Sequence, residues 1–193
     1  MKFLKRIEVI GFVLMLLLIW SNLFIDFPGQ DILTGIIVGF APMIYLIGGF
    51  FFFSKSPLSS YKFSVVFGAA MGFAFSILII GMLFKIQMYQ GSKIMMYAGM
   101  GMVGAGLLAA IIMMLKADEH KSYWKGQMPR LALLLITGIV VSSYADDNLL
   151  NIKYGDYPFY IEARKAYDEN PTEENLQMLI EADEKMDSLK RFQ

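Results

Sequence analysis

Five long apolar runs limit what this chain can fold into more than any other feature. They are Val9–Ile25, Ile32–Phe53, Phe63–Phe84, Ile94–Leu115 and Leu131–Ala145. A bilayer core about 30 Å thick needs about 20 helical residues. The middle three runs are therefore long enough to cross a membrane, and the first is long enough with its flanks. The fifth is short and crosses only if the Arg130 side chain extends to one interface.

The composition agrees with a membrane protein. Of 193 residues, 56% are hydrophobic and 18% are charged, and the mean hydropathy is +0.52. Ordinary soluble domains are about half apolar and about a quarter charged. We therefore predict an all-α, multi-pass transmembrane helical bundle. Cysteine is absent, which excludes a disulfide framework, a thiol nucleophile and a cysteine-based metal site.

The basic residues near the ends of the apolar runs predict the orientation. Lys2, Lys5 and Arg6 precede the first run, and the second and fourth connections are also basic, whereas the first connection has only acids. The positive-inside rule then places the N-terminus in the cytoplasm. We predict five spans, over residues 5–25, 32–53, 63–84, 94–115 and 130–146. They form a membrane domain of residues 1–145, and residues 146–193 lie outside the cytoplasm.

Two of the predicted hairpins are similar in sequence. The third connection is interpreted as a tight outer turn centred on Gly91 and flanked by Lys85 and Lys93, although two lysines fit poorly outside the cytoplasm. Placing the first hairpin on the second, about 62 residues further on, matches four pairs of residues. These are Gly29 with Gly91, Gly39 with Gly101, Phe27 with Tyr89, and Ile32 with Ile94. The pattern suggests two repeated hairpins plus one further span.

The second hairpin carries a resemblance to a known family. Residues 81–101 read GMLFKIQMYQGSKIMMYAGMG, with an LFKI start, an aromatic turn ending in Gly, and a Gly-Met-Gly triplet in the returning helix. Over residues 81–115, this segment resembles the membrane hairpin of the gliding-motility protein GldL, a component of the gliding and type IX secretion motor of Bacteroidota. The resemblance implies a bacterial inner-membrane location and an outward-facing turn.

The chain departs from that family where an acidic residue would follow the triplet. Here the sequence has Val103 and Gly104. A protonatable group inside the bilayer couples an ion gradient to movement, and the last four runs contain none. Glu8 is the remaining acid at a helix end, and we interpret it as an interfacial charge paired with Lys5. Ion-driven movement by this chain alone is therefore not expected.

Small residues recur at four-residue spacing in three of the runs. They are Gly35 and Gly39; Gly68, Gly72 and Ser76; and Gly101, Ala105 and Ala109. Such stripes let helix backbones approach closely in lipid. Two interpretations remain open, namely packing within one bundle and binding of a partner protein's helices.

The segment after Ala145 is polar and holds most of the acids. We predict a short helix over Pro158–Tyr167 and a second helix that Asn170 caps, with Pro171 at its first position. The two would form a small extracytoplasmic hairpin. The residues proposed for a partner-binding face on the second helix are Leu176, Leu179, Ile180 and Met186.

No motif in the sequence indicates an enzyme. The single histidine, His120, has no further metal ligands near it in sequence, so no catalytic site, metal or cofactor is predicted. Nothing indicates nucleic-acid binding. We expect a non-catalytic subunit or assembly factor of a cell-envelope machine, which contacts the lipid bilayer and other membrane proteins. An ion-handling stator-like or transporter subunit is the alternative. Neither the oligomeric state nor the partner follows from the sequence.

Overall fold

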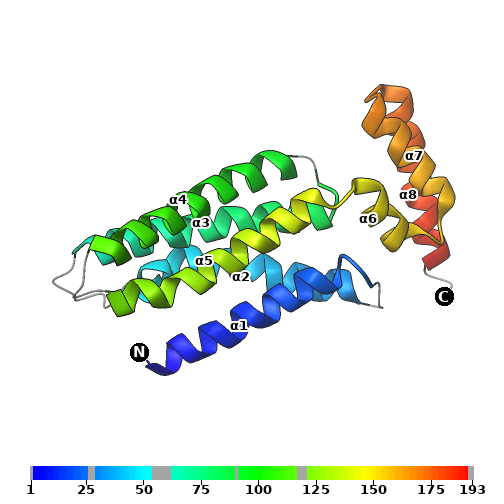
Figure 1. Ribbon diagram of the computed structural model, residues 1–193. Coiled ribbons are helices and arrows are strands. Elements are labelled where there is room, and N and C mark those ends of the chain that lie inside the picture. The colour runs from blue at the N-terminus through cyan, green and yellow to red at the C-terminus, as the bar shows by residue number, and fades with distance from the viewer. Residues whose placement is uncertain (1, 26–28, 54–61, 90, 117–120, 191–193) are drawn as a thin grey trace. The chain divides into compact units, whose positions relative to one another are not determined.

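The computed structural model describes residues 2–25, 29–53, 62–89, 91–116 and 121–190, and within these ranges it contains helices and no strands (Figure 1). The helices are α1 (Lys2–Ser21), α2 (Gln30–Phe53), α3 (Lys62–Ile86), α4 (Ser92–Lys116), α5 (Lys121–Ser143), α6 (Asp146–Tyr154), α7 (Pro158–Glu169) and α8 (Glu173–Lys190). They form two compact units, Met1–Tyr144 and Ala145–Gln193. The predicted all-α class is confirmed.

Among the described residues, four helices are long and apolar enough to cross a membrane. They are α2, α3, α4 and α5, with mean hydropathies of 2.0, 2.3, 2.1 and 1.3 over their apolar windows. Helix α1 is 20 residues long but begins with Lys2, Lys5, Arg6 and Glu8. The structure therefore supports a helical membrane protein with four candidate spans. A crossing by α1, the predicted fifth span, remains a proposal.

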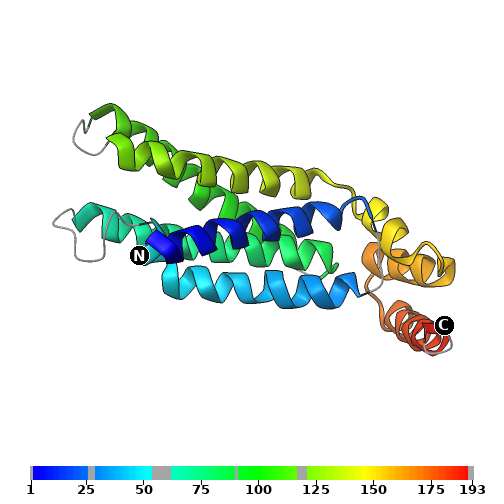
Figure 2. The same ribbon diagram turned by 90° about the horizontal axis from the view of Figure 1, so that it is seen from below.

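Helix α3 forms the centre of the first unit. The helices from α2 to α5 pack against one another in chain order, and α3 lies between α2 and α4 (Figures 1 and 2). Of the apolar stretch of α3, 61% is buried within the protein, compared with 22% of the apolar stretch of α4. Helix α1 packs on α2, α3 and α5. One face of α4 is therefore left for lipid or for another protein.

Helix α5 begins earlier than predicted. The sequence favoured a short span over residues 130–146, with a polar connection before it, whereas the helix runs from Lys121 to Ser143 and continues through Pro129. Its first turns bury Trp124 and Gln127, and Trp124 stacks edge-on against Phe67 of α3 with ring centroids 4.9 Å apart. This packing lies in the segment that the sequence indicated as a loop, and α5 as a whole is long enough to cross a membrane.

The two matched glycines adopt the same backbone conformation. Gly29 and Gly91 both have φ of +81°, a left-handed conformation that glycine adopts without steric cost. Each precedes a helix and accepts the first backbone bond of that helix, from Leu33 at 3.0 Å and from Met95 at 3.2 Å. Phe27, a further residue of the predicted repeat, lies outside the described residues.

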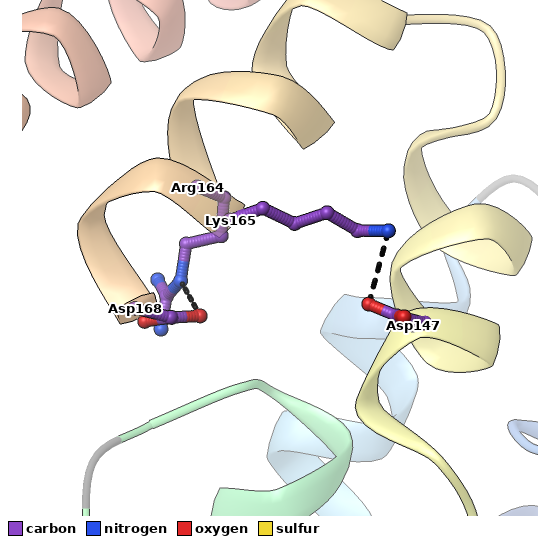
Figure 3. A network of polar contacts seen from close by, with 4 residues as sticks. All are labelled: Asp147, Arg164, Lys165 and Asp168. Carbon is purple, nitrogen blue, oxygen red and sulfur yellow. Dashed lines mark hydrogen bonds and ion pairs between the residues drawn. The ribbon is translucent and has the colours of Figure 1, made fainter. Parts of the chain in front are cut away.

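The second unit consists of α6, α7 and α8. Its core contains Tyr157 and Tyr160 from the start of α7, and Ala182 and Met186 from α8. Lys165 of α7 also lies 3.1 Å from Asp147 of α6, and Arg164 bonds Asp168 one turn further along α7 at 3.0 Å (Figure 3). Both pairs are substantially exposed and contribute little to stability. The aromatic core holds the unit together.

The cap of α8 differs from the prediction. Asn170 closes α7, with its backbone N–H donating to the carbonyl of Ala166 at 3.0 Å, and α8 begins only at Glu173. The hydroxyl of Thr172 accepts the backbone N–H of Asn175 at 3.3 Å and is the cap. The residue before a proline is driven to extended backbone, and Asn170 has φ of −143° and ψ of 92°. The helix starts two residues later than predicted, at Glu173.

Candidate functional site: a buried ion pair and two classes of glycine

Glu8 is buried in the first unit, and three helices contribute to its surroundings. Its Oε2 lies 2.9 Å from Nη2 of Arg130 on α5, and its Oε1 accepts a hydrogen bond of 2.9 Å from the hydroxyl of Tyr45 on α2. The Glu8 side chain is 4% exposed and that of Arg130 is 18% exposed. Glu8 is therefore buried and bonded to α2 and α5. The side chain of Lys5, its predicted partner, lies outside the described residues.

The arrangement is chemically consistent with an ionised carboxylate. A charge removed from water is tolerated only when it is paired and hydrogen-bonded. Glu8 obtains the guanidinium of Arg130 and the hydroxyl of Tyr45, and the pair of charges sums to zero. The last four apolar runs contain no acid, and the buried carboxylate of Glu8 is carried by α1 and not by α4.

A second level of polar contacts joins the same three helices at the other end of α1. The Trp20 indole Nε1 donates to the hydroxyl of Thr137 on α5 at 3.2 Å. The Asn22 side-chain amide donates to the hydroxyl of Thr34 on α2 at 2.8 Å. Hydrogen bonds or ion pairs therefore connect α1 to both α2 and α5 near its start, at Glu8. Trp20 and Asn22, which directly follows Ser21, make the corresponding bonds near its end.

An apolar cavity lies next to the Glu8 level, between α1 and α2. It measures about 320 Å³. Its lining includes Gly11, Met15, Ile37 and Ala41, with Glu8 and Tyr45 as the polar contributors. At Gly11 no atom lies within 4 Å of the position that a Cβ would occupy. The cavity could hold an apolar group in contact with a carboxylate.

Some glycines bring helix backbones into direct contact. A Cβ on Gly72 of α3 would lie 2.4 Å from the Tyr45 carbonyl oxygen and 2.6 Å from Cα of Gly49 on α2. A Cβ on Gly99 of α4 would lie 2.6 Å from Cα of Leu78 on α3. Gly72 was predicted for packing, whereas Gly49 and Gly99 were missed because they lie outside the chosen four-residue stripes.

Other predicted residues adjoin the α2–α3 seam. Gly68 is buried, and its carbonyl oxygen would lie 3.0 Å from a Cβ on Gly49. The Ser76 hydroxyl donates to the Pro42 carbonyl of α2 at 2.7 Å. Pro42 lies inside α2, which continues as one helix from Gln30 to Phe53.

The remaining predicted small residues have little or no close contact within the described chain. No atom lies within 4 Å of a Cβ placed on Gly39 or Gly101, and a Cβ on Gly35 would meet only the Gln87 side-chain nitrogen at 3.8 Å. Ala105 is exposed, and Ala109 is half-buried. The interpretation of these stripes as packing within one bundle is wrong for Gly39 and Gly101. A helix turns through about 100° per residue, so Gly99 and Gly101 lie on different faces of α4.

The residues of the predicted outer turn have different surroundings. Gly91 and Lys93 are exposed. Lys85 lies in the last turn of α3 and is 5% exposed, with a partner inside the protein.

Some residues of the predicted partner-binding face on α8 are buried in the second unit, and others are exposed. Met186 is buried and Leu179 packs on the core of the second unit, whereas Leu176 and Ile180 are 39% and 44% exposed. Burial raises the pKa of Tyr160, which keeps its hydroxyl neutral in this core. Leu176 and Ile180 are thus the part of the face that stays open.

No group of three or more His, Asp or Glu side chains within the described ranges is placed to hold a metal ion. His120 lies outside those ranges. The Glu8 site was missed because its partners are 37 and 122 positions away in the chain. The sequence did contain a signal for this site. Glu8 lies inside a predicted membrane helix, and Arg130 directly precedes another apolar run.

Comparison of the chain with protein-family models, with curated proteins and with solved structures found no match.

Proposed function

We propose that this protein is a non-catalytic membrane subunit or assembly factor of a cell-envelope complex, which binds a partner through the open face of α4. The resemblance of residues 81–115 to the GldL hairpin suggests a motor or secretion complex of the bacterial inner membrane as the class of machine. In this proposal α1 also crosses the membrane, with the N-terminus in the cytoplasm and the C-terminal unit in the periplasm.

The observation that carries the proposal is the position of Gly101. It and Gly104 have no atom within 4 Å of a Cβ position, and Ala105 beside them is exposed. Glycine weakens a helix relative to alanine and is useful where another backbone must come close. Gly99 supports such an approach to α3. Gly101 has no neighbour within the described chain, and a helix of another protein would supply one.

The test compares Gly101→Leu with Gly72→Leu by affinity purification in mild detergent. Leucine at Gly72 meets backbone atoms and is expected to destabilise the fold. Leucine at Gly101 has space within the monomer, so we expect a normally folded protein that no longer co-purifies with its partner. Gly101→Ala, which adds one methyl group, is the matched control and should retain most of the partner.

Retention of the full partner set by a folded Gly101→Leu variant would contradict the proposal. Unfolding of that variant in detergent would contradict the open position of Gly101 itself. The two outcomes are separated by size-exclusion chromatography before the partners are identified.

An ion-handling role is the second candidate, and the buried Glu8 carboxylate favours it. Intramembrane acids are expensive and commonly functional, and this acid adjoins a cavity of about 320 Å³. Glu8→Gln keeps the shape and removes the charge. Loss of cell function in a stable Glu8→Gln variant with an intact partner set would favour ion handling over the scaffold.

Reporter fusions test the proposed orientation. A reporter that is active only outside the cytoplasm should be active after Gln193 and inactive at Ser122. Inactivity of the C-terminal fusion would mean that the number of crossings is even.

A further inference from the structure

A groove beside α1 and α5 combines two cationic side chains with an apolar wall. It measures about 430 Å³ and is lined by Arg6, Val9, Ile10 and Arg130. Arg6 is exposed, and among the described residues it has no ion-pair partner. Val9 and Ile10 are 39% and 61% exposed. The groove is therefore basic at Arg6 and Arg130 and apolar along α1.

Among the described side chains that line the groove, one positive charge is left uncompensated. Arg130 is paired with Glu8 at 2.9 Å, so these two groups cancel. Arg6 supplies the remaining charge. A phosphodiester carries one negative charge and would bring the set to zero. The planar guanidinium also presents two parallel N–H donors, which match the oxygens of a phosphate.

The position of the groove along the sequence matches the level of lipid headgroups. Arg6 lies at the junction between the basic start of α1 and its apolar part, and Arg130 directly precedes Leu131 in α5. Basic residues at such junctions attract anionic lipids. A free phosphate would use the two arginines alone, whereas a lipid would also cover Val9 and Ile10.

We propose that this groove binds one anionic phospholipid, with its phosphodiester at Arg6 and Arg130 and an acyl chain along Val9 and Ile10. The lipid then covers the side of the Glu8–Arg130 pair and helps to exclude water from it. This inference is independent of the proposed partner of α4.

The test is native mass spectrometry of the full chain in detergent, with phosphatidylglycerol and phosphatidylcholine supplied in equal amounts. We expect one phosphatidylglycerol to be retained in preference to phosphatidylcholine. Arg6→Gln should weaken that retention about fivefold, because one basic residue near a membrane surface contributes about that factor. Lys125→Gln removes the same charge from an exposed position on α5 and should leave retention unchanged. Arg130→Gln is not used because it also breaks the pair with Glu8.

Three results would overturn the proposal. Equal retention of the two lipids would remove the headgroup preference. Equal loss in Arg6→Gln and Lys125→Gln would show a general attraction to positive charge and no site. Displacement of the lipid by millimolar inorganic phosphate would assign the groove to a free anion.

Discussion

The two hairpins that share a turn geometry are held together by different physical means. The α3–α4 hairpin packs backbone against backbone, and a Cβ on Gly81 would lie 2.7 Å from the Met96 nitrogen. The α1–α2 hairpin encloses a cavity of about 320 Å³ and is joined by polar side chains at two levels. The same turn conformation at Gly29 and Gly91 is therefore followed by different helix–helix packing in the two hairpins.

The residues at matched positions explain the difference. In the alignment of Gly29 with Gly91, Gly81 corresponds to Ile19, and Gly99 corresponds to Ile37. Isoleucine at these places keeps the α1 and α2 backbones apart, since close approach in lipid depends on small residues. Directional bonds from Glu8 and Asn22 then hold α1. The comparison teaches that the same turn can join two closely packed helices or two separated ones, according to one residue on each helix.

Breaking the ion pair should have the largest effect on the first hairpin. Arg130→Gln leaves the Glu8 carboxylate buried without its countercharge, and loss of one partner of a buried pair costs about 3–5 kcal/mol. We expect a fall of that order in the unfolding free energy in detergent, monitored by circular dichroism. The double variant Glu8→Gln/Arg130→Gln should recover more than half of the loss. No recovery would mean that Arg130 acts through packing and not through Glu8.

Widening the second hairpin should have the next largest effect. Gly99→Leu places side-chain atoms on the Leu78 backbone, and overpacking of this kind costs about 1–3 kcal/mol. The thermal unfolding midpoint should fall clearly, while Gly101→Leu, two residues further along α4, should leave it close to that of the unmodified protein. Equal midpoints for the two variants would contradict the assignment of Gly99 to the seam.

Removing one hydroxyl should weaken the first hairpin to a comparable degree. Tyr45→Phe deletes the hydrogen bond to Glu8, and a bond to a charged group contributes about 1.5–3 kcal/mol. Tyr97→Phe on α4 is a suitable control, because Tyr97 is 61% exposed. A chemical denaturation series should separate the two variants. If both lost the same stability, the Tyr45–Glu8 bond would contribute nothing particular.

A matched pair of glycine substitutions should change stability in opposite directions. At Gly11 nothing lies within 4 Å of a Cβ position, so Gly11→Ala should gain up to about 1 kcal/mol from helix propensity. Gly81→Ala meets the Met96 backbone nitrogen at 2.7 Å and should lose stability despite the same propensity gain. Unfolding midpoints measured side by side decide the signs. A gain for both would mean that the α3–α4 seam opens readily.

Much of the local structure could be predicted because it depends on nearby residues. Run length and hydropathy were sufficient for α2, α3 and α4, and the Gly29 and Gly91 turns followed from spacing. The first turns of α5 could not be predicted, because packing of Trp124 on Phe67, and no local pattern, extends that helix. The cap of α8 was misplaced by two residues, because Asn170 and Thr172 are both residue types that cap helices and only the structure shows that Thr172 does so.

The sequence by itself determined the helical class, the four apolar lengths and the places where the chain can turn. Only the tertiary structure decided which side of each helix faces inward, because a helix that is apolar all round has no polar face to orient it. For this reason Gly99 and Gly101 could not be told apart beforehand, although one touches α3 and the other faces outward. The same holds for Glu8, whose charge is tolerated only because folding brings Arg130 and Tyr45 to it from two other helices.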